Sequence, residues 1–200
     1  MSLFAGCMKS EPQGQRDLLL LVATALNTHR VPYLLSGSFA SSYYGHPRAT
    51  HDIDFVVEVN KERLDLLRKA IVGLGKGFAI AARKLVHVSM PQMVNSYHAG
   101  TGIKTDFWIT DTEDFSVKYA RRRFMAIDRT RISLIAPEDL ILTKLAWCKE
   151  LRSERHMQDC VGIWRVQKGK LDEEYLRRRV NELSVTQLFD EISSTIRQLT

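Results

Sequence analysis

The chain has 200 residues, of which 44% are hydrophobic and 26% charged, so wholesale disorder is excluded and one sizeable core can be buried. Lys and Arg exceed Asp and Glu by 6 (29 − 23), which permits a polyanionic partner such as RNA without requiring one. The longest apolar run near the start covers only residues 18–25, and no cysteines are spaced as C-x-x-C, so neither a membrane span nor a zinc site is indicated. We therefore expect a cytoplasmic protein with free thiols and no membrane contact.

The first part of the chain alternates helical and strand patterns. Apolar spacing predicts an amphipathic helix over residues 13–30, a short buried strand over 31–36, and a helix over 38–44 that ends at Gly45. After a loop, β-branched and aromatic residues predict a strand over 52–59. A helix over residues 61–73 follows, with Asn60 as its N-cap.

The middle of the chain is less regular. The segment 78–98 is the hardest to interpret, with strands suggested at 85–88 and 92–96. Alternation predicts a strand over residues 103–110 that carries Lys104, Asp106 and Trp108 on one face. We expect a helix over 115–121 and then a hairpin formed by residues 123–127 and 131–135.

The last part of the chain is helical. Pro137 stands at the favoured early position of a helix over residues 137–151. Three more helical segments are predicted over residues 154–167, 171–183 and 185–198. The pattern indicates an α/β core over residues 1–136 and a helical part over 137–200 that packs on it as one domain.

Two carboxylates lie in an apolar strand pattern. An acid-x-acid spacing is expected roughly two or three times by chance in a chain with this acid content, and it occurs three times. Only Asp52-Ile53-Asp54 lies in an apolar run, where alternation places both acids on one face of a strand. Context therefore distinguishes this pair from Asp111/Glu113 and Asp172/Glu174, which we interpret as helix starts.

A possible anion site precedes the two acids, and a third acid follows them. Gly37-Ser38 places free backbone N–H groups at a helix start, where anions bind. Asp106 lies on a later strand that we expect to be adjacent to the first. Carboxylates and substrate phosphates are the oxygen ligands that Mg²⁺ takes, so this arrangement is typical of two-metal phosphoryl or nucleotidyl transfer.

The motif also resembles a known superfamily. Gly37-Ser38, thirteen intervening residues and Asp52-Ile53-Asp54 resemble the hG[GS]…Dh[DE]h signature of the polymerase-beta-like nucleotidyltransferases. The run from Arg48 to Asp54 and the block from Pro137-Glu138-Asp139-Leu140 to Lys144 and Asp159 are similar to the minimal nucleotidyltransferases of the AbiEii toxin group. This resemblance covers residues 30–165. It implies a nucleotidyltransferase fold, in which helices flank a mixed β-sheet and a helical extension follows.

The resemblance implies a role for each acid in metal binding. Asp52 and Asp54 would ligate two Mg²⁺ ions, and Asp106 would be the third ligand or the base for the acceptor hydroxyl. The alternative for Asp106 is an ordinary strand acid paired with Lys104 or Arg123.

The resemblance also implies a nucleotide-binding set. Gly37 and Ser38 would hold the β- or γ-phosphate, and Ser38 can also act as a plain N-cap. Arg48 would contact the triphosphate or position its loop. Lys144 would bind phosphate or extend to solvent. Asp159 would orient Lys144, touch the nucleotide, or pair with Arg155.

The leading hypothesis is Mg²⁺-dependent transfer of a nucleoside monophosphate from an NTP to a hydroxyl, with release of pyrophosphate. Basic runs at 121–123 and 177–179 fit a tRNA or other RNA acceptor, as in a toxin with an antitoxin partner, but they fit solvated helix faces and a protein or antibiotic acceptor too. A non-catalytic NTP-binding scaffold and a DxD sugar-nucleotide glycosyltransferase are the alternatives. We expect the three tryptophans to be core residues rather than a stacking platform: Trp108, Trp147 and Trp164.

Overall fold

One mixed sheet forms the centre of the protein. A computed structural model describes residues 11–58, 60–75, 78, 81, 83, 85, 92–110 and 113–198. Within them, six strands pair in the order β3-β4-β2-β1-β6-β5. The strands are β1 (Tyr33–Leu35), β2 (Asp52–Glu58), β3 (Gln92–His98), β4 (Ile103–Thr110), β5 (Arg123–Ile127) and β6 (Thr130–Leu134).

The six strands form one sheet that contains both parallel and antiparallel pairs. β2 pairs in parallel with β4 and antiparallel with β1, and β1 pairs in parallel with β6. The outer strands β3 and β5 each pair antiparallel with their neighbour. Along β2, buried and half-buried residues alternate, so that Ile53, Phe55 and Val57 face one layer while Asp52 and Asp54 face the other.

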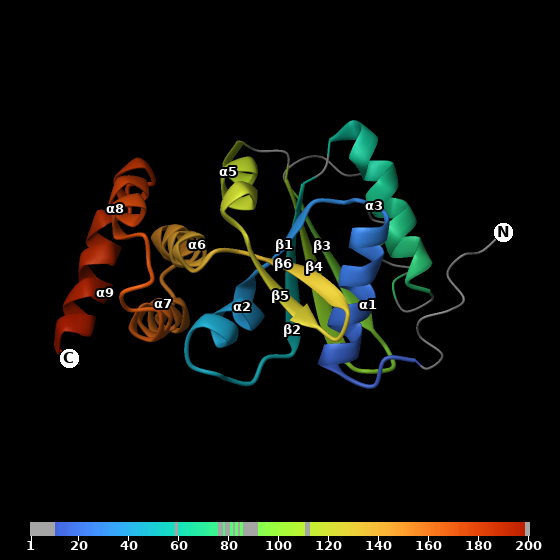
Figure 1. The fold of residues 1–200 in the computed structure, drawn as a ribbon, viewed down its shortest axis with the longest axis horizontal. Helices are drawn as coiled ribbons and strands as arrows, with labels where there is room; N and C mark the ends of the chain where they lie inside the picture. Colours follow the sequence, from blue (N-terminus) through green and yellow to red (C-terminus); the bar gives the residue numbers. More distant parts are fainter. Residues whose placement is uncertain are drawn as a thin grey trace.

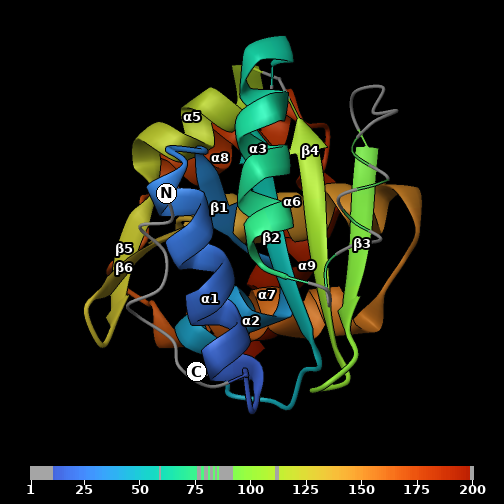
Figure 2. The ribbon, with the colours of Figure 1, turned by 90° about the vertical axis from the view of Figure 1, so that its right-hand side faces the viewer.

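Helices cover both faces of this sheet. They are α1 (Gln15–Thr28), α2 (Gly37–Tyr44), α3 (Lys61–Gly73), α5 (Glu113–Arg121), α6 (Pro137–Glu150), α7 (Glu154–Val166), α8 (Glu173–Glu182) and α9 (Thr186–Gln198). Figure 1 shows α1 and α3 on one side of the sheet and α2, α6 and α7 on the other. Viewed from the α1 and α3 side, these two helices lie in front of the central strands (Figure 2).

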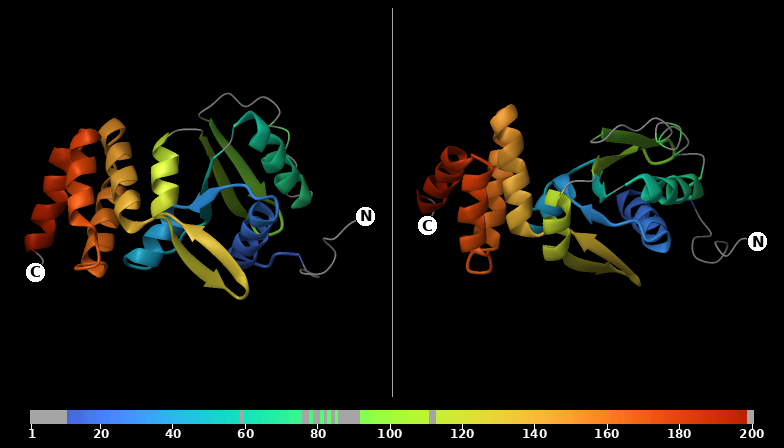
Figure 3. Two further views of the ribbon diagram at one scale, coloured as in Figure 1. Left: turned by 45° about the horizontal axis from the view of Figure 1, so that its top comes forward. Right: turned by 90° about the horizontal axis from the view of Figure 1, so that it is seen from above.

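The C-terminal helices stack at one end of the molecule (Figure 3). Helix α6 is deeply buried among them. Its residues Leu140, Ile141 and Leu145 are at most 1% exposed. Helices α7 and α9 pack against one another, and α8 contacts α6. The helical part is thus tied to the sheet through α6, which follows β6 after two residues.

Most of the predicted elements are confirmed, including the α/β fold with its helical C-terminal part. Asn60 is the N-cap of α3, where its side chain accepts a hydrogen bond from the Arg63 N–H. The strand predicted at 31–36 is shorter than expected and covers Tyr33–Leu35. The strand suggested at 85–88 lies outside the described residues except Leu85, which belongs to a helical turn. No helix among the described residues is long and apolar enough to cross a membrane.

Candidate active site

The register of β2 and β4 brings the three predicted acids to one face of the sheet. Asp54 lies directly opposite Asp106, and Asp52 lies opposite Lys104. Both strands run in the same direction, so their alternating side chains stay in phase. Asp106 is only 5% exposed because the edge strand β3 and the neighbouring side chains cover it.

The Gly-Ser turn lies directly over Asp54. The Ser36 N–H donates to the Asp54 carbonyl at 2.9 Å, and the Ser38 N–H is hydrogen-bonded to the Asp54 carboxylate. Gly37 has φ +59°, and a Cβ built on it would overlap the Asp54 carboxylate and lie 2.7 Å from the Asp54 Cβ. Glycine is required here on two grounds, the left-handed backbone and the lack of space for a side chain.

The acids are close enough to affect one another electrostatically. The pKa of Asp54 is raised, first by burial and then by the charge of Asp106, with a further contribution from Asp52. The Ser38 N–H and the charge of Lys144 oppose this shift without cancelling it. Burial and the neighbouring acids therefore both disfavour the ionised form of Asp54, which a bound cation would favour.

The third acid is engaged by protein donors. Asn95 donates its side-chain N–H to Asp106 Oδ1 at 2.9 Å, and Lys104 Nζ contacts Asp106 Oδ2 at 2.6 Å. Consistent with this, no group of three or more His, Cys, Asp or Glu residues in the described part of the chain is arranged to hold a metal ion. The pairing of Asp106 with Lys104 that we considered from the sequence is therefore present.

A second cluster links α2, α6 and α7 next to these acids. Arg48 donates to both oxygens of Asp159 at 3.0 Å and to Ser38 Oγ at 2.8 Å. Lys144 Nζ lies 2.9 Å from Asp159 Oδ2, and Lys144 is only 3% exposed. Asp159 thus contacts Lys144, as one of its three alternatives requires. The alternative in which Lys144 extends to solvent is wrong, since its side chain is buried against α7.

Electrostatic attraction stabilises the cluster of Arg48, Lys144 and Asp159. Burial alone would raise the pKa of Asp159, but the hydrogen bonds from Arg48 and the charge of Lys144 outweigh burial and lower it. Two cations share this one carboxylate, so the set of three carries a net positive charge. Since the charge of Lys144 also lowers the pKa of Asp54, the two clusters adjoin.

Some residues differ from the sequence-based prediction. Asn95 was missed because the segment 78–98 has no readable pattern, and only strand pairing places it at Asp106. Trp147 is 39% exposed, so the prediction that it is a core residue is wrong. The ring of Trp147 contacts both Trp108 and His156, at centroid distances of 5.5 Å and 5.6 Å.

Five of the six arginines in the two basic runs make contacts within the protein, and Arg122 does so over the Tyr119 ring. Arg121 lies 3.5 Å from Glu138, Asp139 and Asp172, and its guanidinium lies over the Tyr175 ring. The three arginines of the second run each pair with an acid of α5 or α8: Arg177 with Glu173, Arg178 with Glu182, and Arg179 with Asp114 and Glu182. These runs therefore support the interpretation as helix faces more than the interpretation as an RNA groove.

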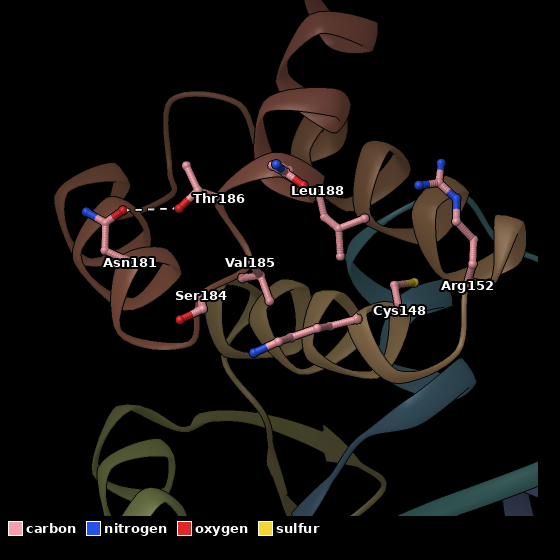
Figure 4. A pocket seen from close by; sticks show the side chains of 9 residues that line it. Cys148, Arg152, Asn181, Ser184, Val185, Thr186 and Leu188 are labelled. Carbon is pink, nitrogen blue, oxygen red and sulfur yellow. Dashed lines mark hydrogen bonds between the residues drawn. The ribbon is translucent and has the colours of Figure 1, made fainter.

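A pocket of about 530 Å³ lies elsewhere, between α6 and the α8–α9 connection (Figure 4). Its two basic side chains already have partners, since Lys149 donates to the Leu183 carbonyl and Arg152 pairs with Glu191. None of the residues predicted from the sequence lines it. We therefore place the candidate site at the sheet face rather than in the larger pocket.

Comparison with solved structures identifies the fold. ANT(2'')-Ia in complex with adenylyl-2''-tobramycin is 12% identical, with a TM-score of 0.56 over 85% of this chain and 97% of that chain. A solution structure of the antibiotic-resistance factor ANT(2'')-Ia is 13% identical, with a TM-score of 0.57 over 89% of this chain and 95% of that chain. No family model matches the sequence. No curated protein matches it either. The chain therefore has a nucleotidyltransferase fold.

Proposed function

We propose that this chain is a nucleotidyltransferase that moves a nucleoside monophosphate from an NTP to a hydroxyl acceptor. The observation that supports this most is the placement of the Gly37 turn over Asp54, directly opposite Asp106 and beside a net positive cluster. Acids that would bind a metal thus face cations that would bind phosphate. A nucleoside triphosphate bound to Mg²⁺ requires both.

The chain's own residues would position the triphosphate. Lys144 and Arg48 share one carboxylate between them, so their remaining positive charge attracts phosphate oxygens. Asp159 fixes the direction of both cations and acts as a positioning residue. Ser38 would contribute its hydroxyl, which now accepts from Arg48.

The chemistry of the donor set suits Mg²⁺, although its three carboxylates are not arranged around a metal position while Lys104 and Asn95 engage Asp106. Asp52, Asp54 and Asp106 would supply the hard carboxylate oxygens that this ion takes, and the pKa of Asp54 is raised by burial first and then by the charge of Asp106. Bound Mg²⁺ would neutralise the triphosphate and help to deprotonate the acceptor hydroxyl. Lys104 would have to release Asp106, and its side chain is 41% exposed, so it has room to move.

A small hydroxyl compound is the acceptor that we favour. Four of the six arginines that suggested an RNA groove, Arg121 and residues 177–179, are paired with acids, and this weakens the electrostatic reason for RNA. ANT(2'')-Ia, whose fold is similar, was solved with adenylyl-2''-tobramycin, so aminoglycosides are the first compounds to test.

The test is a transfer assay with each labelled NTP, Mg²⁺ and a panel of acceptors that includes tobramycin and bulk tRNA. We expect transfer to at least one acceptor by the wild type. The Asp52→Ala/Asp54→Ala variant should lose at least about 100-fold, because removal of two metal ligands should cost more than the roughly 10- to 100-fold that loss of an outer-shell partner costs. Transfer that survives in this variant would refute the proposal.

The toxin role implied by the resemblance to the AbiEii group is the second candidate. It predicts that tRNA is labelled in the assay and that expression arrests growth only when Asp52 and Asp54 are intact. A non-catalytic scaffold would bind NTP without transfer to any acceptor. The glycosyltransferase alternative loses its support, because the Gly37 turn and Asp106 are explained by the nucleotidyltransferase fold.

A further inference from the structure

A second pocket lies on the same face of the sheet as the candidate acids. It has a volume of about 250 Å³ and lies between β2, β4, α5 and α6. Its walls are mainly apolar, with Val56, Trp108, Phe115, Ile135 and Trp147 among the lining residues. The pocket is smaller than the 300–1,000 Å³ that drug-sized ligands occupy, so its size suits one ring system.

This pocket continues the candidate site along the same three elements. On β2 and β4, Val56 and Trp108 follow Asp54 and Asp106 by two residues, which keeps them on the same face at about 6.6 Å further along the strand. On α6, Trp147 follows Lys144 by three residues and so lies on the same side of the helix. A ligand that extends from the charged site along these elements would therefore reach the pocket.

Two tryptophans, Trp108 and Trp147, form the aromatic part of the pocket wall. The rings of Trp108 and Trp147 lie 5.5 Å apart between centroids and are inclined by 40° to one another, so they form a corner and not a closed stack. Trp147 keeps 39% of its surface exposed, so part of its ring is open to a ligand. A flat ring placed against this corner would cover aromatic surface that is now in contact with water.

We propose that this pocket binds the nucleobase of the NTP. The proposal rests on the proposed function, since it requires the triphosphate to lie at Asp54, Arg48 and Lys144. A nucleotide has one polyanionic end and one flat, weakly polar end. The charged candidate site matches the polyanionic end, and the adjoining apolar pocket matches the flat base. At the rim, the ion pair of Asp114 with Lys118, 2.6 Å apart, offers an acceptor and donors to the edge of a base.

The pocket suits the base better than the acceptor. Side chains of α5 and α6 line it opposite the sheet, and its volume of about 250 Å³ matches one ring system better than a compound of several rings. The sheet face over β3 is more open, since Met93 and Tyr97 are 37% and 62% exposed. Asn95 and Lys104, which contact Asp106, border that open face, so an acceptor can approach Asp106 from there.

The experiment separates the base from the phosphates. Calorimetric titration in the presence of Mg²⁺ compares ATP, GTP, CTP and UTP with inorganic triphosphate, which carries the charge but no base. We expect at least one NTP to bind wild type more tightly than triphosphate. Trp147→Ala should then weaken that NTP by roughly 5- to 150-fold, the range that stacking on an aromatic ring gives, and leave triphosphate affinity unchanged.

Two variants serve as controls. Trp147→Phe keeps an aromatic face and should restore most of the NTP affinity, and Trp164→Phe should change nothing, because Trp164 packs against Phe189 in the helical part. Equal weakening of NTP and triphosphate in Trp147→Ala, or no weakening of either, would overturn the proposal. An unchanged NTP affinity with a raised KM for the acceptor would assign the pocket to the acceptor and overturn it too.

The two proposals fail in different ways. If wild type binds neither NTP nor triphosphate, the proposed function fails and the base site fails with it. If wild type binds all four NTPs no more tightly than triphosphate, only the base site is overturned, and the nucleotidyl transfer assay decides the function independently.

Discussion

Single residues in this protein serve the candidate site at some expense to the stability of the fold. Gly37 accepts a left-handed backbone so that its turn can approach Asp54. Asp54 is a partly buried carboxylate next to two other acids, Asp52 and Asp106. Such placements are common at functional sites, where a structure tolerates local conflict because the rest of it is consistent.

Replacement of Gly37 should be severe. Gly37→Ala introduces both a strained φ and an overlap with the Asp54 carboxylate, so we expect a loss on the order of 3 kcal/mol in the free energy of unfolding, and loss of NTP binding. Urea denaturation measures the first effect and calorimetry the second. Gly73→Ala is the matched control, because nothing lies within 4 Å of its Cβ position, and its stability should be unchanged or slightly higher. Equal effects at the two glycines would contradict this account.

Removal of the Asp54 charge should stabilise the protein while it abolishes transfer. A raised pKa means that the folded state favours the neutral carboxyl, so the ionised form costs stability at neutral pH. We expect Asp54→Asn to raise the free energy of unfolding by about 0.5–2 kcal/mol without Mg²⁺, measured by thermal and urea unfolding. The exposed Asp65→Asn should stay within about 0.5 kcal/mol. A less stable Asp54→Asn variant would show that Ser38 and Lys144 already compensate the charge.

Elements of this fold are joined by buried ion pairs as well as by apolar packing. Asp159 on α7 holds Lys144 on α6 and Arg48 in the loop after α2. At the other end of α6, Glu138 and Asp139 are fully buried and face Arg121 from α5, and Tyr175 from α8 donates to Asp139 at 2.5 Å. Pairing of this kind fixes the relative positions of helices, because a buried charge without its partner is costly.

The pair at Asp159 can be tested by removing the carboxylate charge. Asp159→Asn leaves Lys144, which is 3% exposed, without an ionised partner, and we expect a loss of about 3–5 kcal/mol in the free energy of unfolding. The exposed pair of Arg16 with Asp128 provides the control, since Asp128→Asn should cost at most about 1 kcal/mol. Similar losses for the two variants would show that burial adds nothing to the Asp159 pair.

The same pair predicts a pH dependence. Asp159 has a lowered pKa, so its contribution is fully present above the ordinary value of 3.8 and is lost as the pH falls through the lower value of the folded state. Wild type should therefore lose stability in acid more steeply than Asp159→Asn when urea midpoints are compared between pH 6 and pH 2. Parallel curves would exclude Asp159 as a cause of acid sensitivity.

At the scale of the whole molecule, the sheet and the C-terminal helices share one interface. α6 follows β6 after two residues, and its buried face contains Leu140, Ile141 and Leu145. The candidate site uses this interface, because the acids lie on strands while Lys144 and Asp159 lie on helices. A shared interface of this kind favours unfolding in one step.

We expect residues 1–200 to unfold as one cooperative unit, which tests the prediction that residues 137–200 pack on 1–136 as one domain. Trp108 reports on the sheet and Trp164 on the helical part, so variants that keep only one of these tryptophans should give the same urea midpoint. Far-UV circular dichroism should agree with both. Separate midpoints would show two units that unfold independently.

Much of the fold and part of the site could be predicted from the pattern of single residues. The alternation in Ile53-Asp54-Phe55 and the helix start at Gly37-Ser38 required only local rules, and both are borne out by β2 and by α2. Asn95 and the exposure of Trp147 could not be predicted, because they depend on strand pairing and on the helix that covers each face. The arginine runs were ambiguous for the same reason, since only packing gives Arg121 its buried partners.

The sequence by itself determined the order of most helices and strands, the face of β2 that carries two acids, and the helix start at Gly37-Ser38, because periodicity and capping preferences act over a few residues. The tertiary structure alone decided that Asp106 lies opposite Asp54, that Lys144 points inward to Asp159, and that two tryptophans border a pocket next to the acids. These depend on contacts between residues far apart in the chain. Such contacts follow from how whole elements pack, which no local pattern specifies.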